Sequence, residues 1–348
     1  MIRRCQLKFW LVALTLLHLA VACAGFFAPY DPAEQDRESP YSPPARVHLV
    51  DQQGRVHARP FFYASRRSEG SFDHFEEDTR KVRKLQFFVT GSRYRLFGLI
   101  AARLHLFGAE GGRLYLFGTD AFGRDLFSRI LYGGQFSLLA GLLGAGCTLL
   151  IGGLFGTAAG FFGGWRDALL MRSAEVFLAL PWLYLLIALR AFLPLTVRPF
   201  EAFLLVVVVL AIVGWARPAR LVRAVVLSAK ERDFVGAARG FGAGDAYLLR
   251  RHILPETTGV LLTQAAILIP QFVLAEMTLS FIGLGIPEPV PSWGNLLSAL
   301  QEYSVLVSYW WMYLPAFATI PFFVGYLGLA NALQVSMMTG KINVDDTR

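Results

Sequence analysis

The chain has 348 residues, of which 55% are hydrophobic and 17% are charged, and its mean hydropathy is +0.48. Soluble domains carry about 25% charged residues, so this composition excludes an ordinary soluble protein and indicates a membrane. The net charge of +8 lies mainly in loops between apolar runs, which argues against a nucleic acid partner. The three cysteines lack metal-ligand spacing and form no disulfide framework, so we expect neither a metal site nor a cofactor.

Six apolar runs are long enough to cross a bilayer, because about 20 residues of helix span its hydrocarbon core. Backbone groups must pair internally in lipid, so each run is predicted to be a helix. The runs are Phe9–Ala28, Phe136–Phe162, Ser173–Leu195, Phe200–Val222, Gly259–Gly283 and Ser308–Val335. We therefore expect an all-α polytopic membrane protein with six transmembrane helices, the first at residues 9–28 and the other five within a core at residues 134–337.

Basic residues orient the predicted spans. The N-terminal tail at residues 1–8 is basic, and the positive-inside rule places it in the cytoplasm. Its basic residues are Arg3, Arg4 and Lys8. An even number of spans places the tail at residues 338–348 on the same side. The first run also has features of a cleaved signal peptide, but it stays apolar as far as Ala28, and we interpret it as a retained helix.

Residues 29–133 are expected to form one long extracytoplasmic segment of nearly balanced charge between the first two spans. Lys84–Thr90 and Tyr94–Leu99 alternate between apolar and polar residues, which predicts short strands in a small, partly β insert. Two interpretations of the segment stay open. It is either a gate or receptor for a binding protein, or a spacer packed on its own spans.

Glycines recur at four-residue intervals in the second run, at Gly152, Gly156 and Gly160. Small residues at this spacing allow two helix backbones to approach closely, because packing drives helix association within lipid. The pattern predicts one tightly packed helix pair.

The cytoplasmic loop at residues 224–256 is basic and contains several glycines. Lys230 to Arg239 is predicted to be helical and to carry an apolar stripe surrounded by charged residues. The stripe consists of Phe234, Ala237, Ala238 and Phe241. Aromatic side chains often anchor interfaces, so the stripe is a candidate docking surface.

A second helix is expected after a turn at Gly242, whose lack of a side chain permits unusual backbone angles. Asp245 is predicted to cap this helix, which would extend through Leu254. Pro255 is expected to stop it before the fifth span begins, with His252 as a structural residue near its end.

The chain lacks the sequence motifs of common catalytic sites. It has no Gly-x4-Gly-Lys-Ser/Thr loop for ATP phosphates, no His-Glu-x-x-His pair and no Gly-x-Ser-x-Gly elbow. We therefore predict no catalytic residues. Glu276, inside the fifth run, either lines a pathway or pairs with a neighbouring helix, because intramembrane charges are costly. An intramembrane enzyme that uses Glu276 and His252 is disfavoured, since the two residues lie on distant segments.

The loop resembles the cytoplasmic coupling loop of ATP-driven import permeases, where a Glu-Ala-Ala-x3-Gly pattern is followed by His-x-x-Pro. The matching residues are Ala237, Ala238, Gly242, His252 and Pro255, and Gly236 stands where the family has its Glu. Three further phrases are similar to the dipeptide, oligopeptide and nickel branch of these ABC transporter permeases, in its second-permease type. They are Phe117–Arg129, Trp215–Arg223, and Glu276–Gly285 followed by Pro291–Asn295.

This resemblance implies the type I ABC importer permease fold and a transport subunit in a bacterial inner membrane that carries peptides or a related small solute. It implies four kinds of partner: a second, different permease subunit, two ATP-binding cassette ATPase subunits, an extracytoplasmic solute-binding protein and the lipid bilayer. The residues implied to couple to the ATPase are Phe234, Gly236, Ala237, Ala238, Arg239, Phe241, Gly242, Asp245, His252 and Pro255. The alternative is a membrane receptor or scaffold that works mainly through its extracytoplasmic segment.

Overall fold

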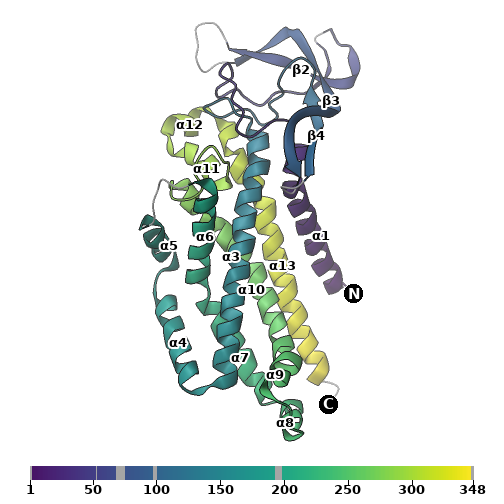
Figure 1. Ribbon diagram of the computed structural model, residues 1–348. Coiled ribbons are helices and arrows are strands. Elements are labelled where there is room, and N and C mark those ends of the chain that lie inside the picture. Colours follow the sequence, from purple (N-terminus) through teal and green to yellow (C-terminus); the bar gives the residue numbers. More distant parts are fainter. Residues whose placement is uncertain (1, 52, 68–74, 97–99, 193–197, 346–348) are drawn as a thin grey trace. The chain divides into compact units, whose positions relative to one another are not determined.

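The computed structural model describes residues 2–51, 53–67, 75–96, 100–192 and 198–345 (Figure 1). The chain divides into two compact units, each built from segments far apart in the sequence. The helical unit comprises Met1–Leu14, Leu138–Leu279 and Phe322–Arg348. The sheet unit comprises Thr15–Ser137 and Ser280–Pro321.

Among the described residues, four helices are long and apolar enough to cross a membrane. The four candidate spans are Cys5–Ala22, within α1 (Ile2–Ala22); Leu126–Phe162, which is α3; Asp245–Phe281, which ends with α10 (Leu254–Phe281); and Trp310–Ser336, most of which lies in α13 (Leu314–Asp345). They correspond to the first, second, fifth and sixth predicted runs. In each the backbone groups pair within the segment, and the helix continues past Pro270 in α10 and Pro321 in α13.

The fourth predicted run forms a bent pair of helices. α6 (Pro199–Gly214) and α7 (Ala216–Lys230) meet at an angle of 45°, and together they have the length and composition of a fifth span. Pro218 lies in the first turn of α7, where its missing N–H has no helical partner to lose. The proline therefore favours a new helix start and a bend at Trp215.

The prediction of one continuous helix at Ser173–Leu195 is wrong. The region contains α4 (Gly164–Ala179) and α5 (Trp182–Ala191), and residues 193–197 lie outside the described part. Leu180 between the helices has an extended backbone, with ψ of 137°. It precedes Pro181, whose ring disfavours the helical conformation of the residue before it.

The predicted glycine seam packs α3 against α7. A Cβ added at Gly152 would lie 2.8 Å from the carbonyl oxygen of Trp215, and one at Gly160 would lie 3.0 Å from that of Arg223. Between them, a Cβ at Gly156 would collide with the carbonyl oxygen of Ala219. The four-residue repeat on α3 thus faces backbone atoms at four-residue intervals on α7, which confirms the predicted close helix pair.

The remaining helices are short and lie mostly in connecting segments. They are α2 (Ala24–Phe27), α8 (Asp233–Gly240), α9 (Asp245–Leu248), the π-helical turn η1 (Leu249–Ile253), α11 (Trp293–Ser298), the 3-10 turn η2 (Ala299–Gln301), α12 (Tyr303–Ser308) and the 3-10 turn η3 (Trp310–Tyr313).

The sheet unit contains four antiparallel strands in the order β1-β2-β3-β4. The strands are β1 (His48–Val50), β2 (Val56–Arg67), β3 (Phe75–Leu96) and β4 (Ile100–Ala109). The predicted β content of residues 29–133 is therefore confirmed, whereas an all-α class for the whole chain is wrong. The two predicted strands fall on a single strand, β3, with a register shift between Thr90 and Tyr94; residues 97–99 of the second lie outside the described part.

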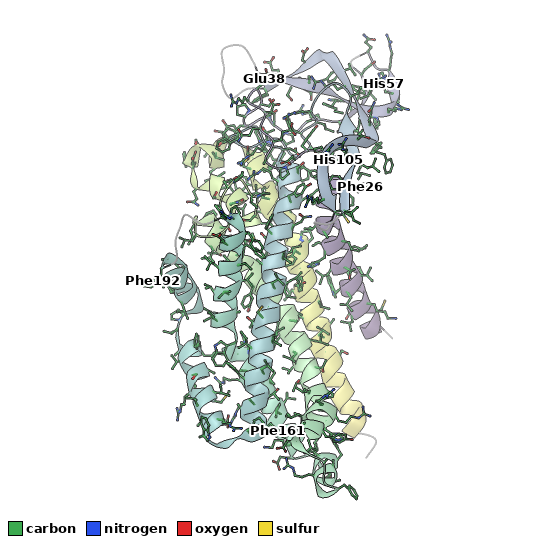
Figure 2. All side chains as sticks on the ribbon, in the orientation of Figure 1. Phe26, Glu38, His57, His105, Phe161 and Phe192 are labelled. Atoms are coloured by element: carbon green, nitrogen blue, oxygen red, sulfur yellow. The ribbon has the colours of Figure 1, made fainter. Side chains whose placement is uncertain are left out.

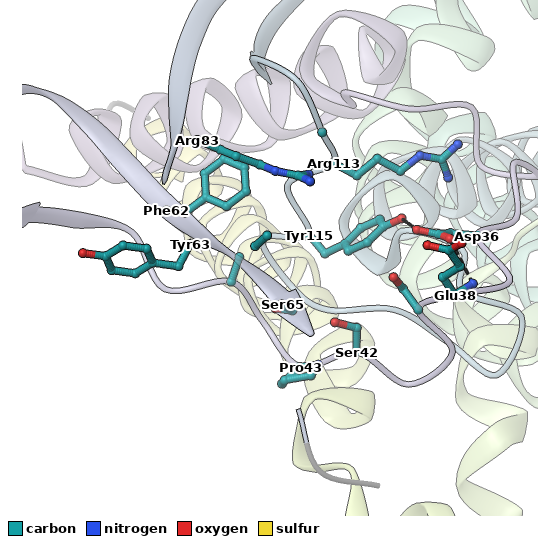
Figure 3. Close-up of a pocket in the computed structure, with 14 residues that line it drawn as sticks. Asp36, Glu38, Ser42, Pro43, Phe62, Tyr63, Ser65, Arg83, Arg113 and Tyr115 are labelled. Carbon is teal, nitrogen blue, oxygen red and sulfur yellow. Dashed lines mark hydrogen bonds between the residues drawn. The ribbon is translucent and has the colours of Figure 1, made fainter. Parts of the chain in front are cut away.

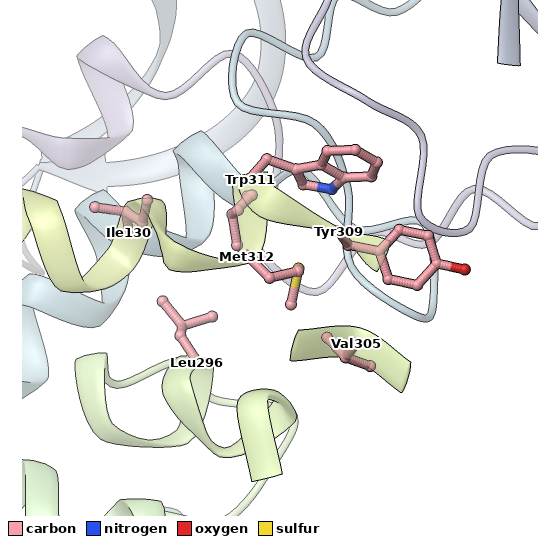
Figure 4. Close-up of a cluster of buried hydrophobic side chains, with 7 residues drawn as sticks. Ile130, Leu296, Val305, Tyr309, Trp311 and Met312 are labelled. Carbon is pink, nitrogen blue, oxygen red and sulfur yellow. The ribbon is translucent and has the colours of Figure 1, made fainter. Parts of the chain in front are cut away.

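An apolar cluster in the sheet unit joins the start of α3 to the segment before α13 (Figure 4). Leu126 and Ile130 of α3 pack with Leu296 of α11 and with Trp311 and Met312 of η3. All five are buried, so this cluster fixes residues more than 160 positions apart in sequence within one core.

Candidate functional site

The loop between α7 and α10 folds as a short helix, a turn and a second helical segment. Two residues, Glu231 and Arg232, separate α7 from α8, so the predicted continuous stretch from Lys230 is interrupted. The turn follows at Gly242, which has φ of +86°. This left-handed conformation is favourable for glycine and costly for residues with a side chain, as predicted.

The inner face of α8 is part of an apolar core in the helical unit. Val235, Leu248 and Ile253 are buried in one cluster with Phe161, near the end of α3 (Figure 2), and with Val226 of α7. The side chain of Ala238 is half-buried and packs against the same cluster. The loop is therefore docked onto the ends of α3 and α7.

Polar contacts reinforce this docking. The ammonium group of Lys230 donates hydrogen bonds to the carbonyl oxygens of Phe161 at 2.8 Å and Gly160 at 3.3 Å, which satisfies acceptors at the C-terminus of α3. Arg232 pairs with Glu256 across the loop at 3.1 Å. Together these contacts tie the N-terminal end of α8 to α3 and α10.

Apolar side chains on the outer face of α8 and on the turn after it are exposed. The side chain of Phe241 is 93% exposed and that of Phe234 is 43% exposed. Gly236, Ala237 and Arg239 are also exposed. A Cβ added at Gly236 would meet no atom within 4 Å among the described residues, so a side chain fits there. This surface can receive a partner.

His252 lies under the loop and has a structural setting. Its ring lies 5.5 Å from that of Phe234 and 5.6 Å from that of Tyr247, between centroids. The side chain is half-buried. It therefore supports the position of Phe234 through ring packing.

Two predictions about the second helix are wrong. The N-cap of α9 is Gly244, whose lack of a side chain leaves Asp245 as the first helical residue without a capping hydrogen bond. Pro255 does not end a helix, because the chain continues through the π-helical turn into α10. The N–H of Leu254 donates to the carbonyl oxygen of Leu249, five residues back, and this wider turn accommodates the proline.

Glu276 is fully buried in α10, in the helical unit, and Gln264 is buried on the same helix. Glu276 and His252 lie roughly 36 Å apart along the helical run at ~1.5 Å per residue. A catalytic pair of these two residues is therefore excluded.

Phe117–Arg129 was noted in the sequence only as a family motif. Its charged residues form ion pairs that the sequence did not predict. Asp120 Oδ1 accepts hydrogen bonds from the backbone N–H groups of Phe122 at 2.9 Å and Arg124 at 3.0 Å. Its Oδ2 accepts a hydrogen bond from Nε of Arg124 at 2.6 Å. Gly123 has φ of +71°, and a side chain there would collide with the backbone of Asp36. The phrase thus folds into a tight, charge-bearing loop of the sheet unit.

Glu288 binds the two arginines of this loop. Its carboxylate lies 2.6 Å from Nη1 of Arg124 and 2.8 Å from Nη2 of Arg129. Arg129 is completely buried and also lies 3.5 Å from Asp120. Glu288 is 46% exposed, so solvent screens part of its attraction to the two arginines. The network therefore fastens the start of α3 to the segment before α11.

Residues 292–295 complete this attachment. Ser292 caps α11 by accepting a hydrogen bond from the N–H of Asn295 at 3.2 Å. The indole N–H of Trp293 donates to the carbonyl oxygen of Ile130 at 3.0 Å, and its backbone N–H donates to Oγ of Ser137 at 3.1 Å. The matching Pro291–Asn295 phrase is thus a structural clamp on α3.

Asp125, directly before α3, is a buried carboxyl group. Its Oδ2 accepts hydrogen bonds from the backbone N–H of Ser128 at 2.8 Å and from its hydroxyl at 2.6 Å, which caps the helix. Among the described residues, Oδ1 has no hydrogen-bond partner. Burial raises the pKa of Asp125 to about 7, against the opposing effect of the hydrogen bonds from Ser128.

Comparisons with known proteins converge on transport across membranes. Residues 152–339 match the family described as the binding-protein-dependent transport system inner membrane component. The chain is 38% identical over 196 residues to a candidate peptide permease protein of Brucella suis. It is 37% identical over 200 residues to the dipeptide transport system permease protein DppC of Bacillus subtilis, and 38% over 199 residues to the oligopeptide transport system permease protein OppC of Haemophilus influenzae.

The alignments cover 56% or 57% of this chain and between 60% and 63% of the relatives, so the chain spans less than two thirds of their length. Two solved structures show weaker likeness. An amino acid ABC transporter crystallised with histidines has a TM-score of 0.42 at 20% identity, covering 60% of this chain and 92% of its own. The MetNI methionine ABC transporter, in an inward facing conformation, has a TM-score of 0.42 at 18% identity, covering 59% and 95%.

Proposed function

Because the chain belongs to the family of binding-protein-dependent transport system inner membrane components, we propose that it is a permease subunit of an ATP-driven importer for peptides or a related small solute. It is a multi-pass inner membrane protein. The relatives whose names mention dipeptide and oligopeptide transport support the cargo class. The type I importer fold with six crossings and an extracytoplasmic insert is part of the same proposal.

The exposed outer face of α8 is the observation that carries this proposal. Phe241 and Phe234 stand on a helix whose inner face is buried in the core. An exposed aromatic side chain on a rigid base is suited to anchor a partner. We place a separate ATPase subunit there, so that ATP hydrolysis occurs on the partner and its closure displaces α8.

The remaining partners follow from the proposed importer. They are a second permease subunit, a second ATPase subunit and an extracytoplasmic solute-binding protein. The residues proposed to contact the ATPase directly are the exposed ones, Phe234, Gly236, Ala237, Arg239, Phe241, Gly242, Asp245 and Pro255. Ala238 and His252 are proposed to support them from below, because both pack inward.

Replacing Phe241 by alanine tests the coupling surface. The side chain is exposed, so Phe241→Ala should leave the chain folded while lowering peptide uptake and co-purification of the ATPase at least tenfold, the effect of losing an anchor worth about 2 kcal/mol. The matched control is Phe192→Ala, since Phe192 is 89% exposed and lies outside the loop.

Uptake into cells and mass spectrometry of the purified complex measure the two effects. Equal uptake and equal ATPase recovery in the Phe241 and Phe192 variants would contradict coupling through α8. Ala237→Glu provides an independent variant, because Ala237 is exposed whereas Ala238 contributes to the core.

A further inference from the structure

A polar cavity of about 240 Å³ lies within the sheet unit (Figure 3). Its walls come from the chain between residues 36 and 45, from residues 62–65 of β2, from Arg83 of β3 and from residues 112–115. All of these segments belong to the sheet unit, and all precede residues 152–339 that match the family.

Two of the charged groups in the cavity wall already have partners. Nη2 of Arg113 lies 2.5 Å from Oε1 of Glu34. The hydroxyl of Tyr115 donates a hydrogen bond to Oδ2 of Asp36 at 2.7 Å. Burial raises the pKa of Tyr115, so the hydroxyl keeps its proton and remains a donor. Arg113 and Asp36 therefore contribute to the cavity wall, and we do not assign them to ligand binding.

Arg83 and Glu38 are the other two charged groups of the wall. Within the described residues, neither side chain makes an ion pair or a hydrogen bond. Figure 3 shows Arg83 entering from the strand side and Glu38 from the loop side. The guanidinium of Arg83 lies directly over Gly112, in space that a side chain at position 112 would occupy. One cation and one anion thus face the cavity.

Ser42 adds an unsatisfied donor to the wall. The residue is 1% exposed, and its hydroxyl has no hydrogen-bond partner among the described residues. Its backbone is held in place, because the N–H of Ser42 donates to the hydroxyl of Thr119 at 2.7 Å. Buried hydroxyls in folded proteins are almost always paired, so this one indicates a site for an acceptor atom.

We propose that this cavity binds a small zwitterionic amino compound, a free amino acid or a short peptide. The ligand carboxylate accepts hydrogen bonds from Arg83 and from the hydroxyl of Ser42, and the ligand ammonium group donates to Glu38. Charge-assisted hydrogen bonds of this kind are the strong ones. The site is independent of the ATPase surface on α8.

Titration of the full chain in detergent with four probes tests the proposal. The probes are alanine, dialanine, N-acetyl-dialanine and dialanine amide, and calorimetry measures each Kd. We expect saturable binding of alanine or dialanine, and comparison of these two identifies which length fits. N-acetyl-dialanine and dialanine amide should each bind about tenfold or more weakly than dialanine, because each block removes one charged end of the ligand.

Variants assign the ends of the ligand. Arg83→Gln should weaken dialanine binding about tenfold or more but leave binding of the amide unchanged, since the amide has no carboxylate to lose. Gly112→Ala should act in the same direction, because it displaces the guanidinium without removing its charge. The control is Arg103→Gln on β4, which removes the same charge from an exposed position outside the cavity.

Three outcomes would overturn the proposal: absence of saturable binding of either alanine or dialanine to the unmodified chain at millimolar concentration, equal binding of the free and blocked dipeptides, or equal weakening by Arg83→Gln and Arg103→Gln. The blocked probes need no variant, so they decide the question even if Gly112→Ala fails to fold. Phe241→Ala should leave all four Kd values unchanged, which separates this site from the coupling surface.

Discussion

Single charged side chains determine much of the architecture of the sheet unit. Asp120, Arg124 and Arg129 are buried and Glu288 is partly exposed, and the four form a network in which each charge has a partner. Buried ions are tolerated only when paired, so the four residues depend on one another. Asp125 beside them differs, because burial keeps its pKa near 7 and one of its oxygens has no hydrogen bond among the described residues.

The raised pKa of Asp125 predicts a pH dependence of stability. The carboxyl ionises near pH 4 in an unfolded chain but near pH 7 in the folded protein. Between these values the folded state holds the extra proton, so this group lowers the free energy of unfolding as pH rises from about 4 to about 7. Asp125→Asn should remove that component and raise Tm at pH 8 relative to the unmodified chain.

Thermal melts of the purified protein across this pH interval measure the effect. The control is Asp51→Asn, because Asp51 lies outside the buried network and the hydrogen bond from the N–H of Arg55 holds its pKa below the usual range. Asp51→Asn should leave the slope between pH 4 and pH 7 unchanged. An unaltered slope in Asp125→Asn would show that Asp125 titrates normally.

At the scale of helices, the seam between α3 and α7 depends on three glycines. A side chain at Gly156 would collide with the backbone of Ala219, which cannot move without shifting α7. Gly146 on the same helix faces open space, with no described atom within 4 Å of an added Cβ. The same substitution should therefore have opposite consequences at the two positions.

Gly156→Ala should lower the free energy of unfolding by about 1–3 kcal/mol, the usual cost of overpacking. Gly146→Ala should not destabilise, since alanine has the higher helix propensity. Differential scanning fluorimetry of both variants in one detergent compares them. If the two variants melt at the same temperature, the close approach of α3 and α7 at Gly156 is refuted.

The length of the apolar runs predicted where helices form. It did not predict where those helices are broken. Four runs form continuous helices, even though Pro270 lies inside α10 and Pro321 inside α13. Pro181 splits the third run, and Pro218 starts α7 and bends the fourth. The same reasoning misjudged Pro255, because the preceding π-helical turn accommodates the residue that was expected to end a helix.

The candidate docking stripe was predictable only in part. Phe234, Ala237 and Phe241 are exposed as a docking surface requires, whereas Ala238 packs inward. Helical spacing alone could not separate these alanines, because the direction of the buried face depends on tertiary contacts with Phe161 and Val226. The role of Glu288 in the sheet unit was likewise invisible, since its partners lie 159 and 164 residues away in sequence.

For the whole molecule, we propose six crossings with both termini in the cytoplasm. Four long helices and the bent pair α6–α7 give up to five crossings. The broken pair α4–α5 provides the sixth in this proposal, and a basic N-terminal tail supports the orientation. The sheet unit would then include the extracytoplasmic insert.

Reporter fusions test this topology. Green fluorescent protein at the C-terminus should fluoresce, because it folds in the cytoplasm. Alkaline phosphatase inserted at Gly54, in the open turn between β1 and β2, should be active, because the enzyme becomes active only outside the cytoplasm. An active phosphatase at the C-terminus instead would mean an odd number of crossings and would remove α4–α5 as a span.

The shared core beneath α8 has a mechanical consequence. Phe161, Val226 and Val235 place α8 and the ends of α3 and α7 in one incompressible block, and the glycine seam leaves no soft layer between the two long helices. In the proposed importer, a displacement of α8 by a partner bound at Phe241 would therefore move the end of α7 with it. Because α6 and α7 meet at 45° near Trp215, we expect a tilt of α7 in that importer to shift α6 sideways.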